Sequence, residues 1–314
     1  MSIQADHLST ACVDPPRAPA RDREAVIELA RAASLEMGVQ DADTIEHCKD
    51  LLRPGTRINI TAFPNQLPAD TGQAARRVRE AGFEPIPHIA VRLLPSHAAL
   101  TDLLGRLQGE AAISEVLLIA GDRPQAAGPF ASVADVMRTE ELGRYGIARV
   151  GVAGHPEGHP HVGHETLRQA ALEKVSLAAS QRLQLRFVTQ FAFTAAPIIQ
   201  WLGQLRSDGI SADVTIGVAG PARLATLVKF AARCGVGASL SALGSKLSSM
   251  VKLVGDRRPD VLIREFSRAR AAGTADFQGI HFFSFGGLPR TCRWIHALSE
   301  GRFEITGAEG FQLE

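Results

Sequence analysis

Carboxyl, imidazole and amide side chains recur where short apolar segments of this sequence end. Carboxyls and imidazoles transfer protons in catalysis, and a glutamine amide offers two donors and an acceptor to a polar ligand. The polar residues in such places are Glu36, Asn59, Thr61, His88, Asp122, His155, Glu157, His159, Gln190, Ser284 and Arg290. If the fold brings these segment ends together, they form a site for acid–base chemistry or for capture of a polar ligand.

Eight apolar segments alternate with helical patterns, and this alternation predicts how the polar ends are positioned. The predicted strands are residues 34–37, 57–63, 85–90, 115–120, 148–153, 185–191, 212–218 and 280–285. Near-continuous apolar segments are typical of parallel strands that are buried on both faces. Eight strand–helix units over residues 33–301 predict a single (β/α)8 TIM barrel, whose functional residues gather at the C-terminal ends of the strands.

Two further helical patterns, residues 239–253 and 259–272, predict extra helices between strands seven and eight. The rival architecture, a doubly wound dinucleotide-binding sheet, usually carries GxGxxG after its first strand, and this sequence has none there. Residues 1–25 are polar and rich in proline and alanine, which predicts a flexible N-terminal tail. Residues 26–314 are then expected to form the barrel as one catalytic domain.

The composition excludes several classes of function. The chain has 314 residues, and 34 lysines and arginines balance 33 aspartates and glutamates, which argues against a nucleic-acid partner or a polybasic membrane anchor. No apolar stretch approaches the ~20 residues of a membrane-spanning helix. The scattered cysteines, without a CxxC motif, predict reduced thiols in a cytoplasmic protein. Whether the chain forms a homo-oligomer stays open.

Three motifs occur in a fixed order along the predicted barrel. They are the Gly121-Asp122 pair, the loop Gly151-Val152-Ala153-Gly154-His155-Pro156-Glu157-Gly158-His159-Pro160, and Val188-Thr189-Gln190-Phe191. In this order and spacing the sequence resembles the methylenetetrahydrofolate reductase family, from about residue 34 to residue 295. The loop with its two His-Pro pairs is the specific element, because a Gly-Asp pair alone is common.

The resemblance implies a role for each matching residue. Glu36 matches the acid that protonates the folate nitrogen as the methylene bridge opens to an iminium, and Asp122 matches the aspartate near the flavin and the pterin. Gln190 and Arg290 match residues that hold the folate or the nicotinamide, and Leu224 stands where the family stacks a phenylalanine. The flavin-side positions are Thr61, His88, Ala120, Gly121, Asp122, Ala153, His155, His159 and Lys174.

The activity that the resemblance implies is that of an oxidoreductase. It would interconvert 5,10-methylenetetrahydrofolate and 5-methyltetrahydrofolate, with NAD(P)H as co-substrate and bound FAD as the hydride carrier. The residue types suit these roles, because desolvation in a barrel mouth raises the pKa of a carboxyl such as Glu36 towards neutrality. A glycine such as Gly121 lets the backbone approach a flat cofactor closely.

The departures from the family pattern mainly concern residues that bind the cofactor. Family members often carry arginine at the position of Ala120, where it can meet flavin phosphates, tyrosine at that of His155 and phenylalanine at that of Leu224. Two alternatives therefore stay open. One is a flavin-free reductase that takes hydride directly from NAD(P)H, and the other is a redox-inactive barrel that binds folate.

Some residues also have purely structural interpretations. His88 can be a core histidine and Asp122 a turn residue. The histidines at 155, 159, 161 and 164 suggest a metal ion, but Pro156 and Pro160 fix a loop rather than a helix, and we predict no metal site. The phenylalanines of residues 281–285 are interpreted as packing, and Cys48, Cys234 and Cys292 as small buried apolar groups in helices.

Overall fold

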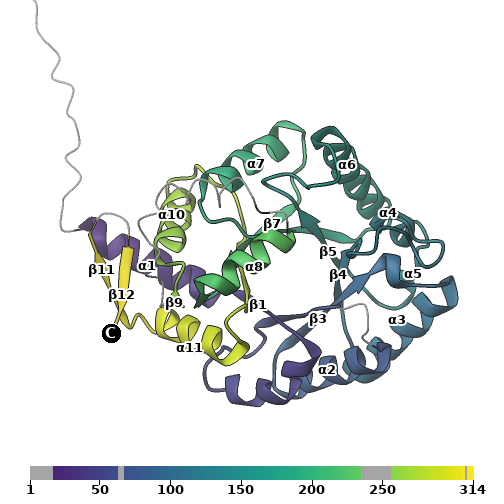
Figure 1. The fold of residues 1–314 in the computed structure, drawn as a ribbon, viewed down its shortest axis with the longest axis horizontal. Coiled ribbons are helices and arrows are strands. Elements are labelled where there is room, and N and C mark those ends of the chain that lie inside the picture. The colour runs from purple at the N-terminus through teal and green to yellow at the C-terminus, as the bar shows by residue number, and fades with distance from the viewer. Residues whose placement is uncertain (1–16, 63–66, 235, 237–255, 308–309) are drawn as a thin grey trace, which may run out of the picture.

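Figure 1 shows the computed structural model, in which we describe residues 17–62, 67–234, 236, 256–307 and 310–314. Eight parallel strands close into a barrel in the order β1-β10-β7-β6-β5-β4-β3-β2. They are β1 Ser34–Met37, β2 Arg57–Ile60, β3 Glu84–Ala90, β4 Glu115–Ile119, β5 Arg149–Gly154, β6 Gln184–Thr189, β7 Asp213–Ala219 and β10 Gly279–Phe283. The (β/α)8 fold predicted from the alternating pattern is therefore confirmed.

A ring of helices surrounds the barrel (Figure 1). The helices are α1 Arg17–Arg31, α2 Pro68–Glu80, α3 His97–Ala111, α4 Val133–Met137, α5 Glu141–Arg144, α6 His164–Ser180, α7 Ala196–Ser207, α8 Leu224–Cys234, α10 Asp260–Ala271 and α11 Leu288–Ser299, with the 3-10 segments η1 Val39–Cys48 and η2 Val91–Leu93. Among the residues described, no helix has both the length and the apolar character needed to cross a bilayer.

Local structure departs from the sequence prediction in three places. The sequence pattern of residues 44–52 predicts a helix, but the structure has the 3-10 segment η1 over Val39–Cys48. The pattern of residues 132–142 also predicts a helix, and it is split into α4 and α5 because Glu140 has a φ of 61°, which no helix interior adopts. Pro221 is a typical first residue of a helix, so the sequence predicts a helix from residue 221, but α8 starts at Leu224 because the two residues before it form β8 (Ala222–Arg223) and pair with β9 (Asp256–Arg257). The predicted helix 239–253 lies outside the described residues, whereas α10 confirms the one at 259–272.

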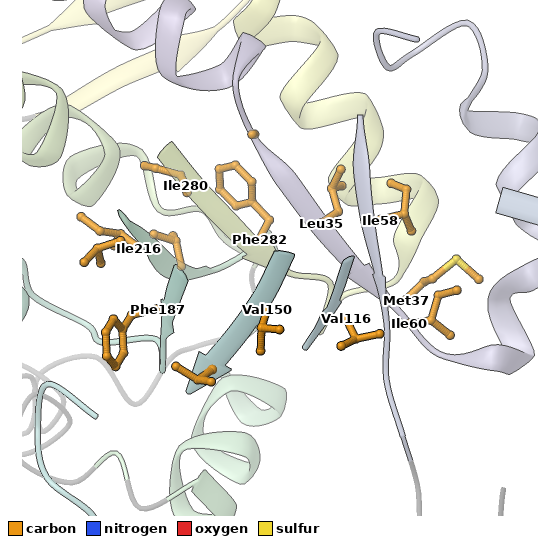
Figure 2. Packing of buried hydrophobic residues seen from close by; sticks show 14 of the residues in the cluster. Leu35, Met37, Ile58, Ile60, Val116, Val150, Phe187, Ile216, Ile280 and Phe282 are labelled. Carbon is orange, nitrogen blue, oxygen red and sulfur yellow. The ribbon is translucent and has the colours of Figure 1, made fainter. Parts of the chain in front are cut away.

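The main apolar core lies between the barrel wall and the helices. Strand residues such as Leu35, Ile58 and Val116 are fully buried there, as Figure 2 shows from close by. Because successive side chains of a strand point to opposite faces, the residues between them face the barrel interior. That interior is unusually polar: Ser34, Glu36, Asn59, His88, Arg186, Thr215 and His281 lie at inward positions alongside a small apolar cluster.

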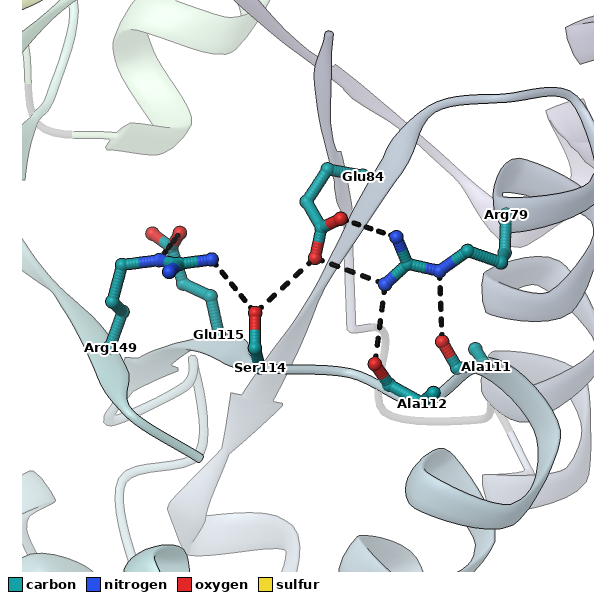
Figure 3. A network of polar contacts seen from close by, with 7 residues as sticks. All are labelled: Arg79, Glu84, Ala111, Ala112, Ser114, Glu115 and Arg149. Atoms are coloured by element: carbon teal, nitrogen blue, oxygen red, sulfur yellow. Dashed lines mark hydrogen bonds and ion pairs between the residues drawn. The ribbon is translucent and has the colours of Figure 1, made fainter. Parts of the chain in front are cut away.

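Charged residues close the N-terminal end of the barrel. Glu115, whose side chain is 2% exposed, forms ion pairs with Arg149 at 3.1 Å and with the buried Arg186. Arg149 also donates to Ser114 Oγ at 2.7 Å, and Ser114 Oγ donates in turn to Glu84 Oε1 at 3.4 Å (Figure 3). Burial lowers the pKa of Arg186 to about 10, opposed by the attraction of Glu115. This end of a TIM barrel serves stability rather than catalysis.

The N-terminal helix is tied to the end of the chain. The carboxylate of Asp22 on α1 accepts from Arg264 Nε at 3.1 Å, and Arg264 donates in turn to the carbonyls of Gly307 and Gly310. The hairpin β11 Phe303–Thr306 with β12 Gly310–Leu313 packs at this place. Of the tail predicted over residues 1–25, residues 1–16 lie outside the described residues, whereas residues 17–25 form the first part of α1, which Asp22 links to Arg264.

Candidate functional site at the C-terminal mouth of the barrel

Glu36 lies on β1 at the C-terminal end of the barrel, between imidazoles from two other strands. Its side chain is 16% exposed, and Oε2 lies 3.8 Å from Nε2 of His281 on β10. Burial raises the pKa of Glu36 to about 7, with an opposing effect of His88 on β3. The carboxyl therefore holds a proton in part of its population at neutral pH, as an acid catalyst must.

His281 is fully buried, and Ser34 and Asn59 fix the orientation of its ring. Its Nδ1 lies 3.0 Å from Ser34 Oγ and 3.5 Å from Asn59 Nδ2. Because an amide nitrogen only donates, Nδ1 accepts and the ring proton lies on Nε2, the nitrogen nearest Glu36. Burial lowers the pKa of His281 to about 3, so the ring is neutral. A neutral N–H thus faces the carboxyl of Glu36.

His88 is buried beside the same carboxyl. Burial lowers its pKa to about 4, opposed by Glu36. Its Nε2 has no hydrogen-bond partner among the described residues. A buried polar atom without a partner is costly, so the interpretation of His88 as a fully hydrogen-bonded core histidine does not hold for this nitrogen.

Asp122 and Gln190 follow strands β4 and β6 at the mouth of the barrel. Asp122 follows β4, is 73% exposed and pairs with Arg233 of α8 at 3.0 Å. Gln190 follows β6, and its backbone N–H donates to Gly154 O at 2.9 Å. Burial, together with Glu36 and Asp122, raises the pKa of the Cys234 thiol to about 11, and the Gln190 side chain bonds this thiol. The end of α8 thus lies among these predicted site residues.

A second group of predicted residues lies after β5. The rings of His155 and His159 meet edge to face with centroids 5.2 Å apart. Burial, then His159 and Lys174, lower the pKa of His155 to about 4, and burial lowers that of Lys174. Arg92 lies near His159, whose pKa is lowered by burial, His161 and Arg92. Because the His155 imidazole is uncharged at neutral pH, the positive charge beside this group comes from Arg92 and Lys174.

The other predicted residues lie at the same end of the barrel. The backbone N–H and the hydroxyl of Thr61 both donate to Met37 O. Ala120 O accepts from Arg92 N at 3.1 Å, and Gly121 has a φ of 87°, with Ala90 against it. Ala153 lies in β5, Leu224 opens α8 and Arg290 lies in the first turn of α11. Among the described residues, no group of three or more metal-ligating side chains converges.

The sequence interpretation missed an aromatic cluster at the mouth. Phe191, Phe193, Phe230, Phe283 and Phe285 pack together between the barrel and α8, with Phe230 stacked on Phe285 at 4.1 Å. The phenylalanines of residues 281–285 pack as interpreted from the sequence, with Phe283 and Phe285 at the C-terminal end of the barrel. Cys234 joins this cluster and is half-buried, so the interpretation as a buried apolar group is corrected.

Ser34 and His281 were missed as well, and a signal for them exists. His281 stands two residues before Phe283 on an inward-facing period, and Ser34 stands two before Glu36. Polar residues in these inward positions differ from the bulky branched side chains that usually fill a TIM barrel.

A scan against models of known protein families finds no match. Among solved structures, the chain is similar to the dihydropteroate synthase (FolP) of Thermus thermophilus, with 10% sequence identity and a TM-score of 0.43. The similarity covers 85% of this chain and 92% of that chain. At this level it says nothing about the reaction, and the barrel assignment rests on the strand order itself.

Proposed function

We propose that this barrel is an oxidoreductase that interconverts 5,10-methylenetetrahydrofolate and 5-methyltetrahydrofolate with NAD(P)H. The observation that carries the proposal is the position of Glu36, whose burial raises its pKa to about 7 at the barrel mouth. It is the residue that the motif resemblance assigns as the acid. Support comes from its setting, a partly desolvated carboxyl between two neutral imidazoles.

Glu36 delivers the proton, and His281 stabilises the carboxylate that remains. The protonated carboxyl gives its proton to the folate nitrogen as the bridge to the methylene carbon breaks. The carboxylate that remains is stabilised by the Nε2–H of His281, which needs only a small shift from 3.8 Å to donate directly. Ser34 and Asn59 hold the imidazole in the orientation that this requires.

The residues around the mouth fit FAD. The unpartnered His88 Nε2 offers a polar contact, and Arg92 and Lys174, which lie beside His155 and His159, offer positive charge to a diphosphate. When bound, FAD would supply the hydride transfer between NAD(P)H and the folate. Gly121, with a positive φ, brings backbone rather than side chain to the cofactor side.

Folate and nicotinamide would share the remaining part of the mouth. Gln190 offers donors and an acceptor to a pterin edge or to the nicotinamide amide. Asp122 supplies a negative charge beside the ring that reacts, and Arg290 supplies a positive charge for an anionic tail of either ligand. The net charge of +1 means that such attraction comes from local groups rather than from the whole molecule.

Binding and turnover separate in the test. Titration of the purified protein with 5-methyltetrahydrofolate should give saturable binding in the wild type and in Glu36→Gln, whereas turnover should be lost only in the variant. Retained turnover in Glu36→Gln contradicts the assignment of the acid.

A flavin-free reductase is the second candidate, and one contact favours it. Arg92 Nε donates to Ala131 O at 2.8 Å and Nη1 donates to Arg123 O at 3.2 Å, so backbone carbonyls already use part of its donor capacity. Ala120 supplies no positive charge for the flavin phosphates. The visible spectrum of the purified protein distinguishes the FAD-dependent from the flavin-free reductase, because only the FAD-dependent enzyme shows flavin absorption bands. Folate binding without turnover from either donor would select the redox-inactive barrel.

A further inference from the structure

Helix α8 lies over the C-terminal mouth of the barrel rather than beside its wall. In Figure 1, which looks onto the barrel, α8 crosses the area that the strands enclose. Its Phe230 stacks on Phe285 with an angle of 11° between the rings, and its Ala231 is fully buried against the aromatic cluster of the mouth. The helix is thus seated on the site by apolar contacts.

Polar contacts hold the last turn of α8 to the proposed site residues. Arg233 Nη2 lies 3.0 Å from Asp122 Oδ2, which reaches over from the loop after β4. The next residue, Cys234, joins the aromatic cluster beside Phe191, which directly follows Gln190. Two consecutive residues of one helix therefore lie against the region where the flat rings of the ligands have to bind.

We propose that the last turn of α8 is a cover that closes the ligand site, with Arg233 and Phe230 as the contacts that must open before a ligand enters. The idea rests on the proposed function only in naming what enters, a flat ring system with an anionic tail. Opening removes Arg233 from Asp122 and so frees both space and a carboxylate. A ligand that binds only the open form shifts the equilibrium towards it.

The contacts have the strength that a reversible cover needs. Both partners of the Arg233–Asp122 pair are more than half exposed, and such pairs are weak and screened by salt. An anionic ligand tail competes for the same guanidinium, which couples ligand arrival to opening. The apolar contact of Phe230 with Phe285 reseats the helix when the ligand leaves.

Hydrogen–deuterium exchange of α8 amides tests the cover without any ligand. In Arg233→Ala the amides of α8 should exchange about two- to fivefold faster than in the wild type, which matches the loss of one exposed ion pair. Lys229→Ala removes an exposed charge from the same helix and should leave the exchange unchanged. Equal exchange in the wild type and in Arg233→Ala, or equal acceleration in Lys229→Ala, overturns the proposal.

Stopped-flow binding then tests the role in ligand entry. With FAD and with 5-methyltetrahydrofolate as probes, Arg233→Ala and Phe230→Ala should raise the association rate constant, and Lys229→Ala should not. Unchanged or slower association in both variants overturns the cover. If neither probe binds the wild type, the proposed function fails, while the exchange result still decides whether α8 opens.

Discussion

Glu36 shows how the surroundings of one residue decide its chemistry. An exposed glutamate is ionised at neutral pH, whereas burial here raises the pKa of Glu36 from 4.5 to about 7. The two buried imidazoles beside it have lowered pKa values, and the attraction of His88 opposes the effect of burial on the Glu36 pKa without cancelling it. The carboxyl is therefore able to donate a proton near neutral pH.

Replacement of this carboxyl should abolish the reaction and its pH dependence. Glu36→Gln keeps the shape and removes the proton, so we expect reduction of 5,10-methylenetetrahydrofolate to slow by roughly 10²- to 10⁴-fold. In the wild type the rate should fall as the pH rises above about 7, because the acid form is lost. Steady-state rates from pH 6 to pH 9 check both points. A variant with the wild-type profile would show that another group donates the proton.

The same shift has a consequence for stability. Because the pKa of Glu36 is higher in the folded than in the unfolded chain, the folded state loses stability as the pH rises from 4.5 to about 7. Glu36→Gln removes this loss, so at pH 8 we expect it to gain up to about 3 kcal/mol relative to the wild type, and little at pH 4. Urea unfolding of both proteins at the two pH values measures the difference. An equal difference at both pH values speaks against the raised pKa.

The sequence could predict the site only in part at this scale. Glu36, His88, Asp122 and Gln190 stand at predicted strand ends, so the (β/α)8 architecture alone brings them to one mouth. Ser34 and His281 stand deeper in their strands, where no strand-end rule applies. Their contact depends on the register Ser34↔His281, which joins the first and last strands of the barrel and is set by closure of the whole sheet.

At the scale of elements, the barrel wall depends on close backbone approach between neighbouring strands. Gly217 in β7 is an example, because a Cβ there would overlap the carbonyl oxygen of Thr189 and the ring of Phe283. The Thr189 hydroxyl also accepts from the Gly217 N–H at 2.8 Å. Gly217 stands within the predicted strand 212–218, and the sequence pattern does not show this close contact.

Gly217→Ala should therefore destabilise the protein by about 1–3 kcal/mol, since the overlap involves backbone that cannot turn away. Gly203→Ala is the matched control: it lies in helix α7 with open space around it, and should stabilise the protein by up to about 1 kcal/mol. Chemical denaturation of the two variants measures these changes. A neutral Gly217→Ala would mean that β6 and β7 separate more easily than the structure indicates.

Helix α8 shows why elements can be predicted more easily than their positions. The pattern of residues 221–234 predicts a helix, and a helix is present from Leu224. Its seat over the mouth depends on Phe230 meeting Phe285, 55 residues later, and on Arg233 meeting Asp122, 111 residues earlier. Periodicity describes one face of one helix and does not specify such distant partners.

At the scale of the whole molecule, the two ends of the chain close the domain together. Helix α1 packs on α10 and α11, and Arg264, buried on α10, joins Asp22 to the C-terminal hairpin. Sequence composition could not show this, because the polar residues of 17–25 look alike whether they are loose or anchored. A buried arginine must have partners, and here they come from both ends.

Removal of the Asp22 carboxylate should therefore lower the free energy of unfolding. Asp22→Ala leaves Arg264 without its carboxylate and should cost about 3 kcal/mol. Asp43→Ala breaks the exposed ion pair with Arg77 and should cost less than about 1 kcal/mol. Comparison of the two denaturation midpoints, with the m-value unchanged, checks the difference. Equal midpoints would contradict the role of Asp22 in anchoring residues 17–25.

We propose that the mouth of this barrel reduces 5,10-methylenetetrahydrofolate with a proton from Glu36. The most direct measurement is the formation of 5-methyltetrahydrofolate by the purified protein under anaerobic conditions, with NADH or NADPH, and with and without added FAD. We expect product in the wild type and a loss of at least about 100-fold in Glu36→Gln. No product from either nucleotide, with or without FAD, would contradict it.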